Sequence, residues 1–130
     1  MDPIKSPAPS NEAGKPRISL DEFSKIEISI GTVRAAERVP LTDKLLRLTV
    51  DFGEVAPDGG ARPRQIISGI AAYVADPADL VERQLAFVTN LAPRTIKGLE
   101  SDGMLFAVGE GDSFAFLTPD RRVPPGTRAH

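Results

Sequence analysis

The sequence predicts an all-β fold, a small closed barrel with short peripheral helices and extensions at both ends. Two segments, residues 26–35 and 45–52, alternate apolar and polar side chains with the period of two that is typical of half-buried strands. Shorter apolar runs follow, separated by turns that contain glycine. The chain has 130 residues, 41% of them hydrophobic, which is enough for one core and leaves no room for a second domain.

Residues 1–17 are expected to form a disordered N-terminal tail, which leaves residues 18–130 as the folded domain. The tail has four prolines among Ser, Asn, Gly and Lys, and no branched apolar or aromatic side chain after Ile4. Such a composition buries too little apolar surface to fold. Beyond the tail, Ser19 and Glu22 have the spacing of a capping box, which predicts a helix of about two turns.

The first helix and the first two strands follow from the apolar pattern. The helix is expected to point Leu20 and Phe23 inward. The first strand is interrupted by Gly31, which predicts a bulge or bend that lets one long strand serve two sides of the barrel. The second strand is strongly amphipathic, and its apolar face consists of Leu46, Leu48, Val50 and Phe52.

Three more strands and a final hairpin partner are expected at residues 64–68, 85–89, 104–108 and 114–117. The first of these strands follows a glycine-rich turn at residues 57–60. Before the second, Asp76 suits the N-cap and Pro77 the first position of a short helix. Periodicity alone does not distinguish one small-barrel topology from another.

The segment from residue 90 to residue 104 is predicted to be a binding loop. Its first half contains two cations, Arg94 and Lys97, and no carboxylate, which suits an anionic ligand such as phosphate. A plain solvated connection is the alternative, because cations on loops are usually solvated. The loop also carries an amide, a hydroxyl and a thioether, those of Asn90, Ser101 and Met104.

Catalysis has little support in this sequence. His130 is the only histidine and the chain has no cysteine, so neither a catalytic triad nor a zinc site can be assembled. We therefore expect no enzymatic activity, no metal and no cofactor. No apolar run approaches the roughly 20 residues needed to cross a bilayer, and no secretory signal is present, so we expect a cytoplasmic protein without a membrane partner.

The net charge of −2 and the pI near 5.4 do not match a protein that binds nucleic acid by bulk attraction. The two signs of charge are, however, segregated along the chain. Carboxylates concentrate near residues 51–58, 76–82 and 100–112, whereas cations concentrate near residues 34–47, 94–97 and 121–128. This distribution permits a basic face, and it favours a partner selected by shape and a few placed contacts.

Three other segments accompany the binding loop in a compatible order: residues 43–48, residues 65–70, and residues 117–120 together with 124–126. With them the chain resembles the tRNA-binding domain family. That family includes stand-alone bacterial tRNA-binding proteins, the C-terminal domain of many methionyl-tRNA synthetases, the chaperone-like protein CsaA and the endothelial monocyte-activating polypeptide module. The resemblance runs from about residue 18 to the end and implies a five-stranded OB-fold barrel.

The resemblance and the loop chemistry together give six candidate RNA contacts, Lys44, Asn90, Arg94, Lys97, Ser101 and Met104. Each has a simpler alternative. Lys44 could be an ordinary turn lysine, Asn90 could tie its own loop together through hydrogen bonds to the backbone, and Met104 could belong to the core. Most of the six phenylalanines occupy strand or helix positions, so stacking on single strands is the weaker hypothesis.

The prediction is a non-catalytic protein that recognises tRNA by shape and backbone as a homodimer. Dimerisation is expected because the helix around Leu20 and the run Val123–Gly126 have no obvious place inside a barrel, and relatives use such additions to pair subunits. Two alternatives remain: a CsaA-like chaperone that binds unfolded or export-bound polypeptides, and a methionyl-tRNA synthetase appendage that acts in trans with an aminoacyl-tRNA synthetase.

Overall fold

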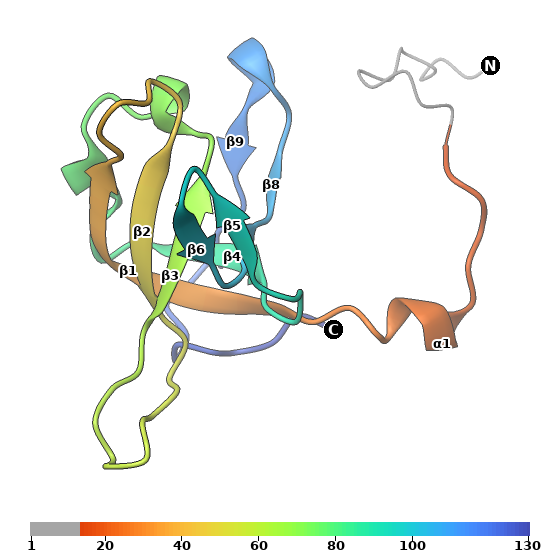
Figure 1. The fold of residues 1–130 in the computed structure, drawn as a ribbon. Helices are drawn as coiled ribbons and strands as arrows, with labels where there is room; N and C mark the ends of the chain where they lie inside the picture. The colour runs from red at the N-terminus through yellow and green to blue at the C-terminus, as the bar shows by residue number, and fades with distance from the viewer. Residues whose placement is uncertain (1–13) are drawn as a thin grey trace.

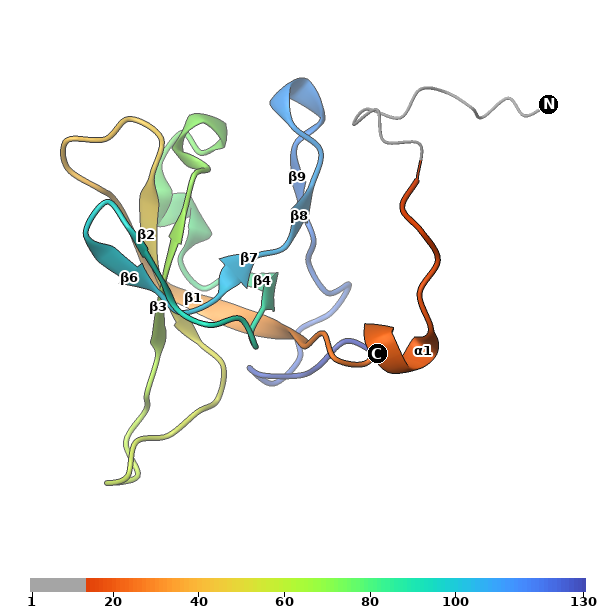
Figure 2. The same ribbon diagram turned by 45° about the vertical axis from the view of Figure 1, so that its right-hand side comes forward.

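The computed structural model describes residues 14–130 as a small antiparallel barrel (Figures 1 and 2). Its five-stranded sheet has the order β3-β2-β1-β4-β7. The strands are β1 (Ile28–Arg38), β2 (Leu46–Asp51), β3 (Arg64–Ser68), β4 (Gln84–Val88) and β7 (Met104–Leu105). The two edges approach each other where the Asp102 amide donates to the Gln65 carbonyl of β3 at 2.9 Å. The predicted all-β, five-stranded barrel is confirmed.

Strand β1 curves around the barrel and pairs with two neighbours, as predicted. Its first half pairs with β4, from Ile28 opposite Val88, and its second half pairs with β2. The bulge, however, lies between Val33 and Ala35, so the prediction of a bulge at Gly31 was wrong. Gly31 is needed for a different reason: a Cβ there would collide with the side chains of Val50 and Phe52.

The core fills the inside of the barrel. It contains the alternating apolar side chains of β2 that the sequence pattern predicted to be buried. Leu46, Leu48 and Val50 on β2 have no exposed surface, and Phe52 is 6% exposed. Phe52 packs edge to face against the fully buried Phe87 of β4, with ring centroids 5.4 Å apart. This pair fixes the centre of the barrel, because an edge-to-face pair adds to the apolar area that both rings bury.

The helices are shorter than expected. Helix α1 (Leu20–Phe23) begins with the predicted capping box of Ser19 and Glu22, but it forms only one turn and lies away from the barrel (Figure 1). Leu20 is 79% and Phe23 51% exposed, so the prediction that they point inward was wrong. The short helix η3 (Pro77–Leu80) has its predicted cap, since the Asp76 carboxylate accepts from the Ala78 amide.

The C-terminal part of the chain departs from the predicted pattern in two places. The single strand expected at residues 104–108 is two strands. The Phe106 amide still donates to the Ala86 carbonyl of β4 at 2.9 Å, but β8 (Ala107–Val108) pairs instead with β9 (Ala115–Phe116). The final residues have a place on the barrel after all. The Thr127 carbonyl accepts from the Ile30 amide at 2.8 Å, and Gly126 donates to the Ile30 carbonyl at 2.7 Å.

Residues 1–13 lie outside the described part of the chain, so the disordered tail stays a prediction; residues 14–17 are exposed and have no helix or strand. No helix within residues 14–130 has the length and apolar character needed to span a membrane.

Candidate nucleic-acid interface

The predicted binding loop contains a β-hairpin rather than irregular structure. Strands β5 (Arg94–Ile96) and β6 (Leu99–Ser101) pair across a two-residue turn. The turn residues Lys97 and Gly98 have φ angles of 51° and 81°, the left-handed values that a tight hairpin turn requires. A lysine followed by glycine is a weak form of this turn signal, and strands of three residues give little periodicity, so the sequence did not reveal the hairpin.

Ser101 attaches the hairpin to the barrel. Its side chain is buried, with 4% exposure, and its hydroxyl accepts from the Ile67 amide at 3.0 Å and donates to the Gly103 carbonyl at 3.1 Å. The hydroxyl proton is therefore used inside the protein. Ser101 therefore positions the hairpin, and its RNA contact stays a prediction.

Asn90 also acts inside the protein. Its side-chain oxygen accepts from the Glu27 amide at 2.9 Å, and its side-chain nitrogen donates to the Lys25 carbonyl at 2.7 Å. The alternative interpretation of Asn90 was correct in one respect, because its side chain does bond to backbone groups. These groups belong to Lys25 and Glu27, however, and not to its own loop. Asn90 joins the start of the loop to the segment that leads into β1.

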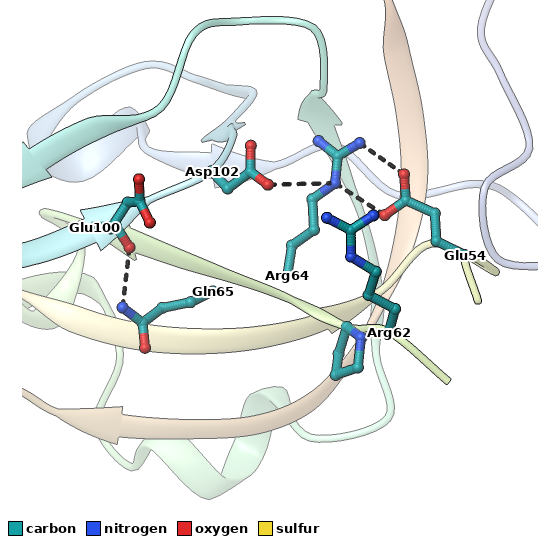
Figure 3. A pocket seen from close by; sticks show the side chains of 7 residues that line it. Glu54, Arg62, Arg64, Gln65, Glu100 and Asp102 are labelled. Carbon is teal, nitrogen blue, oxygen red and sulfur yellow. Dashed lines mark hydrogen bonds and ion pairs between the residues drawn. The ribbon is translucent and has the colours of Figure 1, made fainter. Parts of the chain in front are cut away.

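Arg64, which the sequence did not single out, fixes the other side of the loop. It pairs with Glu54 at 2.7 Å and donates to the Thr89 carbonyl at 2.8 Å, while Asp102 lies 3.9 Å away (Figure 3). The hydrogen bonds from Arg64 lower the pKa of the Glu54 carboxyl, against the opposing effect of burial, and Glu54 raises the pKa of Arg64. The pocket lined by Glu54, Arg64 and Asp102 thus contains a half-buried guanidinium group that already has a carboxylate partner.

Next to Arg64, Gln65 supports the hairpin directly. Its side-chain nitrogen donates to the Glu100 carbonyl of β6 at 2.9 Å (Figure 3). Strand β3 thus holds β6 from the barrel side through a side chain and, at Asp102, through the backbone. The hairpin that carries the predicted cations is attached to a rigid sheet, which is the arrangement that a placed contact needs.

Three of the six predicted contacts are exposed cations without an internal partner. Lys44, Arg94 and Lys97 are exposed, and within residues 14–130 none of them takes part in an ion pair. Arg34 and Arg47 on the barrel differ: Arg34 pairs with Asp51 and Glu82, and Arg47 with Glu37. These three cations are therefore free to meet an external anion.

The fold brings the free cations to two adjoining hollows. Lys44 and Lys97 line a hollow of about 420 Å³ between the β1–β2 connection and the hairpin tip, which approach each other in both ribbon views (Figures 1 and 2). Arg94 and Met104 line a smaller crevice of about 40 Å³ with Ser101. Ile96 lines both, so the two hollows share a wall.

Met104 is available at this surface, with 44% of its surface exposed, although its strand β7 pairs with β4. The expected alternative of a core methionine therefore does not apply to its side chain. Asn90 is the one predicted residue that lines neither hollow. The resulting surface combines separated positive charges with apolar patches, which suits the sugar-phosphate backbone of a folded RNA.

Comparison with known proteins places this chain in a family. A family model described as "Putative tRNA binding domain" matches residues 28–128. The chain is 47% identical over 113 residues to the methionine–tRNA ligase of Methanoregula boonei, covering 87% of this chain and 16% of that enzyme. It is 38% identical over 131 residues to that of Bacteroides fragilis, covering 98% of this chain and 18% of the enzyme. The chain thus spans less than a fifth of the length of these relatives.

Solved structures agree with the sequence comparison. The MetRS-related protein from Pyrococcus horikoshii superposes with a TM-score of 0.77 at 33% identity, covering 89% of this chain and all of the other. The chaperone CsaA from Bacillus anthracis superposes with a TM-score of 0.72 at 28% identity, covering 88% of this chain and all of the other. With its barrel and the match over residues 28–128, the chain belongs to the tRNA-binding domain family.

Proposed function

We propose that this chain is a non-catalytic tRNA-binding module that recognises folded tRNA by its backbone and shape. The observation that carries the proposal is the group of three exposed cations, Lys44, Arg94 and Lys97, which have no ionic partner within residues 14–130 and surround adjoining hollows. A few placed cations on an acidic protein favour selection by geometry over bulk attraction. A cytoplasmic location follows from this function as part of the proposal.

The aromatic residues support recognition of folded RNA over stacking on single strands. Phe52 and Phe87 are buried, and Tyr73 stacks on Phe114 with ring centroids 4.1 Å apart. Phe23 and Phe106 are exposed, but no aromatic ring lines either of the two hollows. A protein that binds single strands without sequence preference uses exposed aromatic platforms along its groove.

The first prediction tests this function by filter binding. Folded tRNA should bind more tightly than heat-unfolded tRNA or single-stranded DNA of equal length. If about three phosphates are neutralised, the logarithm of affinity should fall with the logarithm of salt at a slope between about −2 and −3. Equal affinity for all three nucleic acids would contradict the proposal.

The proposal includes a homodimer, supported by exposed apolar residues in two places. Leu20, Phe23 and Ile26 are exposed around α1, and Phe106 and Val108 are exposed at alternate positions near the end of the sheet. Solvent-exposed apolar residues in such groups are typical of interaction surfaces. A twofold pair would present two RNA surfaces and give one tRNA a broader footprint.

Two other roles compete with this proposal. The structural similarity to CsaA and the exposed apolar residues favour a chaperone that binds unfolded polypeptides. A competition experiment separates the two roles. Unfolded peptide should displace bound tRNA from a chaperone surface, and it should leave tRNA bound to a surface that is specific for tRNA. The methionine–tRNA ligase relatives favour an appendage that acts in trans on a synthetase. Co-purification with a methionyl-tRNA synthetase would support that role.

A further inference from the structure

The larger hollow has the composition of a small-molecule site rather than of a plain basic patch. Its apolar wall consists of Leu41, Leu45 and Ile96, and its polar groups include the side chains of Lys44 and Lys97. Its volume of about 420 Å³ falls within the range of about 300–1,000 Å³ that ligand pockets occupy. Pockets of this kind combine an apolar wall with a few polar groups that orient the ligand.

Two turns with left-handed backbone meet at the same hollow. Within residues 14–130, three residues other than glycine have a left-handed backbone, and two of them, Leu41 with φ 65° and Lys97 with φ 51°, line this hollow from opposite sides. Each belongs to a hydrogen-bonded turn: the Thr42 amide donates to the Val39 carbonyl at 3.3 Å around Leu41, and Lys97 is in the β5–β6 turn. The two turns fix the backbone on both sides of the hollow, and Leu41 presents a fully exposed side chain there.

The charges of the hollow select a ligand that has both an anion and hydrogen-bond donors. Asp43 lies beside Lys44 in the hollow and, like the lysines, forms no ion pair within residues 14–130. A carboxylate would repel a bare phosphate, but its two oxygens accept from a pair of parallel donors. Among the four RNA bases only guanine presents two neighbouring donors, N1–H and N2–H, on its pairing edge.

We propose that this hollow is a guanine-nucleotide subsite of the RNA surface. The base packs against Leu41, Leu45 and Ile96, its N1–H and N2–H donate to Asp43, and its phosphate lies between Lys44 and Lys97. The inference rests on the proposed RNA-binding function, and it adds to that function one unpaired guanine as a specific feature of the bound RNA.

The direct test is an NMR titration of the whole chain with guanosine 5′-monophosphate. The amide signals of residues 41–45 and 96–97 should shift. Inosine 5′-monophosphate, which lacks only the N2 amino group, should bind about tenfold more weakly because one of two paired hydrogen bonds is lost. In Asp43→Asn this difference should largely disappear. Equal binding of the two nucleotides by the parent, shifts confined to other residues, or no binding at millimolar nucleotide would overturn the subsite.

A second test uses tRNA and separates the apolar wall from the cations. Leu41→Asn tolerates a left-handed backbone but removes one of the three apolar side chains of the wall, and it should lower tRNA affinity about tenfold without changing the salt slope. Lys44→Ala should instead reduce the slope by about one. Val55→Asn, at an exposed position on the β2–β3 loop at the opposite end of the barrel, and Lys15→Ala are the matched controls and should bind like the parent (Figure 1).

The two proposals fail in different ways. A parent chain that binds tRNA but no guanine nucleotide at residues 41–45 contradicts the subsite alone. A parent chain that binds the nucleotide there but not tRNA contradicts the proposed function. If an unfolded peptide shifts these amides and the nucleotide does not, the hollow is a peptide site and the guanine assignment is wrong.

Discussion

Single residues on the hairpin divide into those that hold it and those that face outward. Ser101 forms a hydrogen bond with the backbone of β3, and Asn90 forms hydrogen bonds with the backbone of the segment before β1. Arg94 and Lys97 have no ion-pair partner within residues 14–130 and are exposed. Substitutions in the first group should affect folding, whereas those in the second should affect binding.

The second prediction concerns the outward cations. An Arg94→Glu, Lys97→Glu double variant should bind tRNA much more weakly, with a salt slope smaller by about one for each phosphate that the protein no longer neutralises. Its unfolding midpoint should stay close to that of the parent, because exposed charges contribute little to stability. Arg121→Glu is a matched control, since Arg121 is exposed and lines neither hollow. If the double variant bound tRNA with the affinity of the parent, the RNA-binding surface would have to lie elsewhere on the molecule.

The third prediction is a pH dependence of stability that comes from Glu54. Hydrogen bonds from Arg64 hold the pKa of Glu54 below its ordinary value of 4.5 in the folded chain. A carboxyl with a depressed folded pKa stabilises the fold above its unfolded pKa, and this contribution is lost as the pH falls through the folded pKa. Urea unfolding should therefore show the parent losing its advantage over Glu54→Gln as the pH falls below about 4.5. A difference between the two proteins that is independent of pH would contradict this account.

At the scale of elements, β1 determines how the barrel closes. It contacts β4 with one half and β2 with the other, and its passage across the core depends on the close approach of Gly31 to Val50 and Phe52. The bulge between Val33 and Ala35 then adjusts the register toward β2. The glycine at position 31 and the bulge are therefore two separate features of β1, one that makes room for the core and one that shifts the register.

The fourth prediction tests the role of Gly31. Gly31→Ala should destabilise the protein by about 1–3 kcal/mol, because the added methyl group overpacks the core against Phe52. Gly69→Ala is a suitable control, since its Cβ would meet no atom within 4 Å and Gly69 has no positive φ. Chemical denaturation measures both. Equal stability of the two variants would show that β1 can shift to make room.

At the scale of the whole molecule, one group of exposed apolar residues lies apart from the two hollows, around α1 and the β8–β9 hairpin. Helix α1 stands off the barrel, and the β8–β9 hairpin projects on the same side of it in Figure 2. Phe23, Ile26 and Ile28 line a shallow hollow with the C-terminal residues Ala129 and His130. These features support the proposed pairing of two subunits through the chain ends.

The fifth prediction is the oligomeric state. Light scattering should report about twice the monomer mass of 13.9 kDa at micromolar concentration. Removal of residues 1–17 should leave the dimer intact, whereas removal of residues 1–25, which includes α1, should weaken it. Val55→Asp serves as a control for a charge on an unrelated exposed apolar position. A monomer for the parent chain would rule out the dimer and the composite RNA site.

Features that depend on neighbours along the chain could be predicted from the amino-acid pattern. The alternation of residues 46–52 identified the buried face of β2, and the bounds of β3 at residues 64–68 were predicted correctly. The caps at Ser19 and Asp76 were also correct, because a cap is a hydrogen bond over two or three residues. These interactions are local, so their pattern is visible without the fold.

Features that join distant segments could not be predicted and became visible only in the folded barrel. Ser101 meets Ile67, and Asn90 meets Glu27, across separations of 34 and 63 residues that no local pattern encodes. The hollow between Lys44 and Lys97 exists because the hairpin tip folds over the β1–β2 connection. Exposure of a side chain and its choice of partner depend on what else reaches the same place, and that is fixed by the closure of the whole barrel.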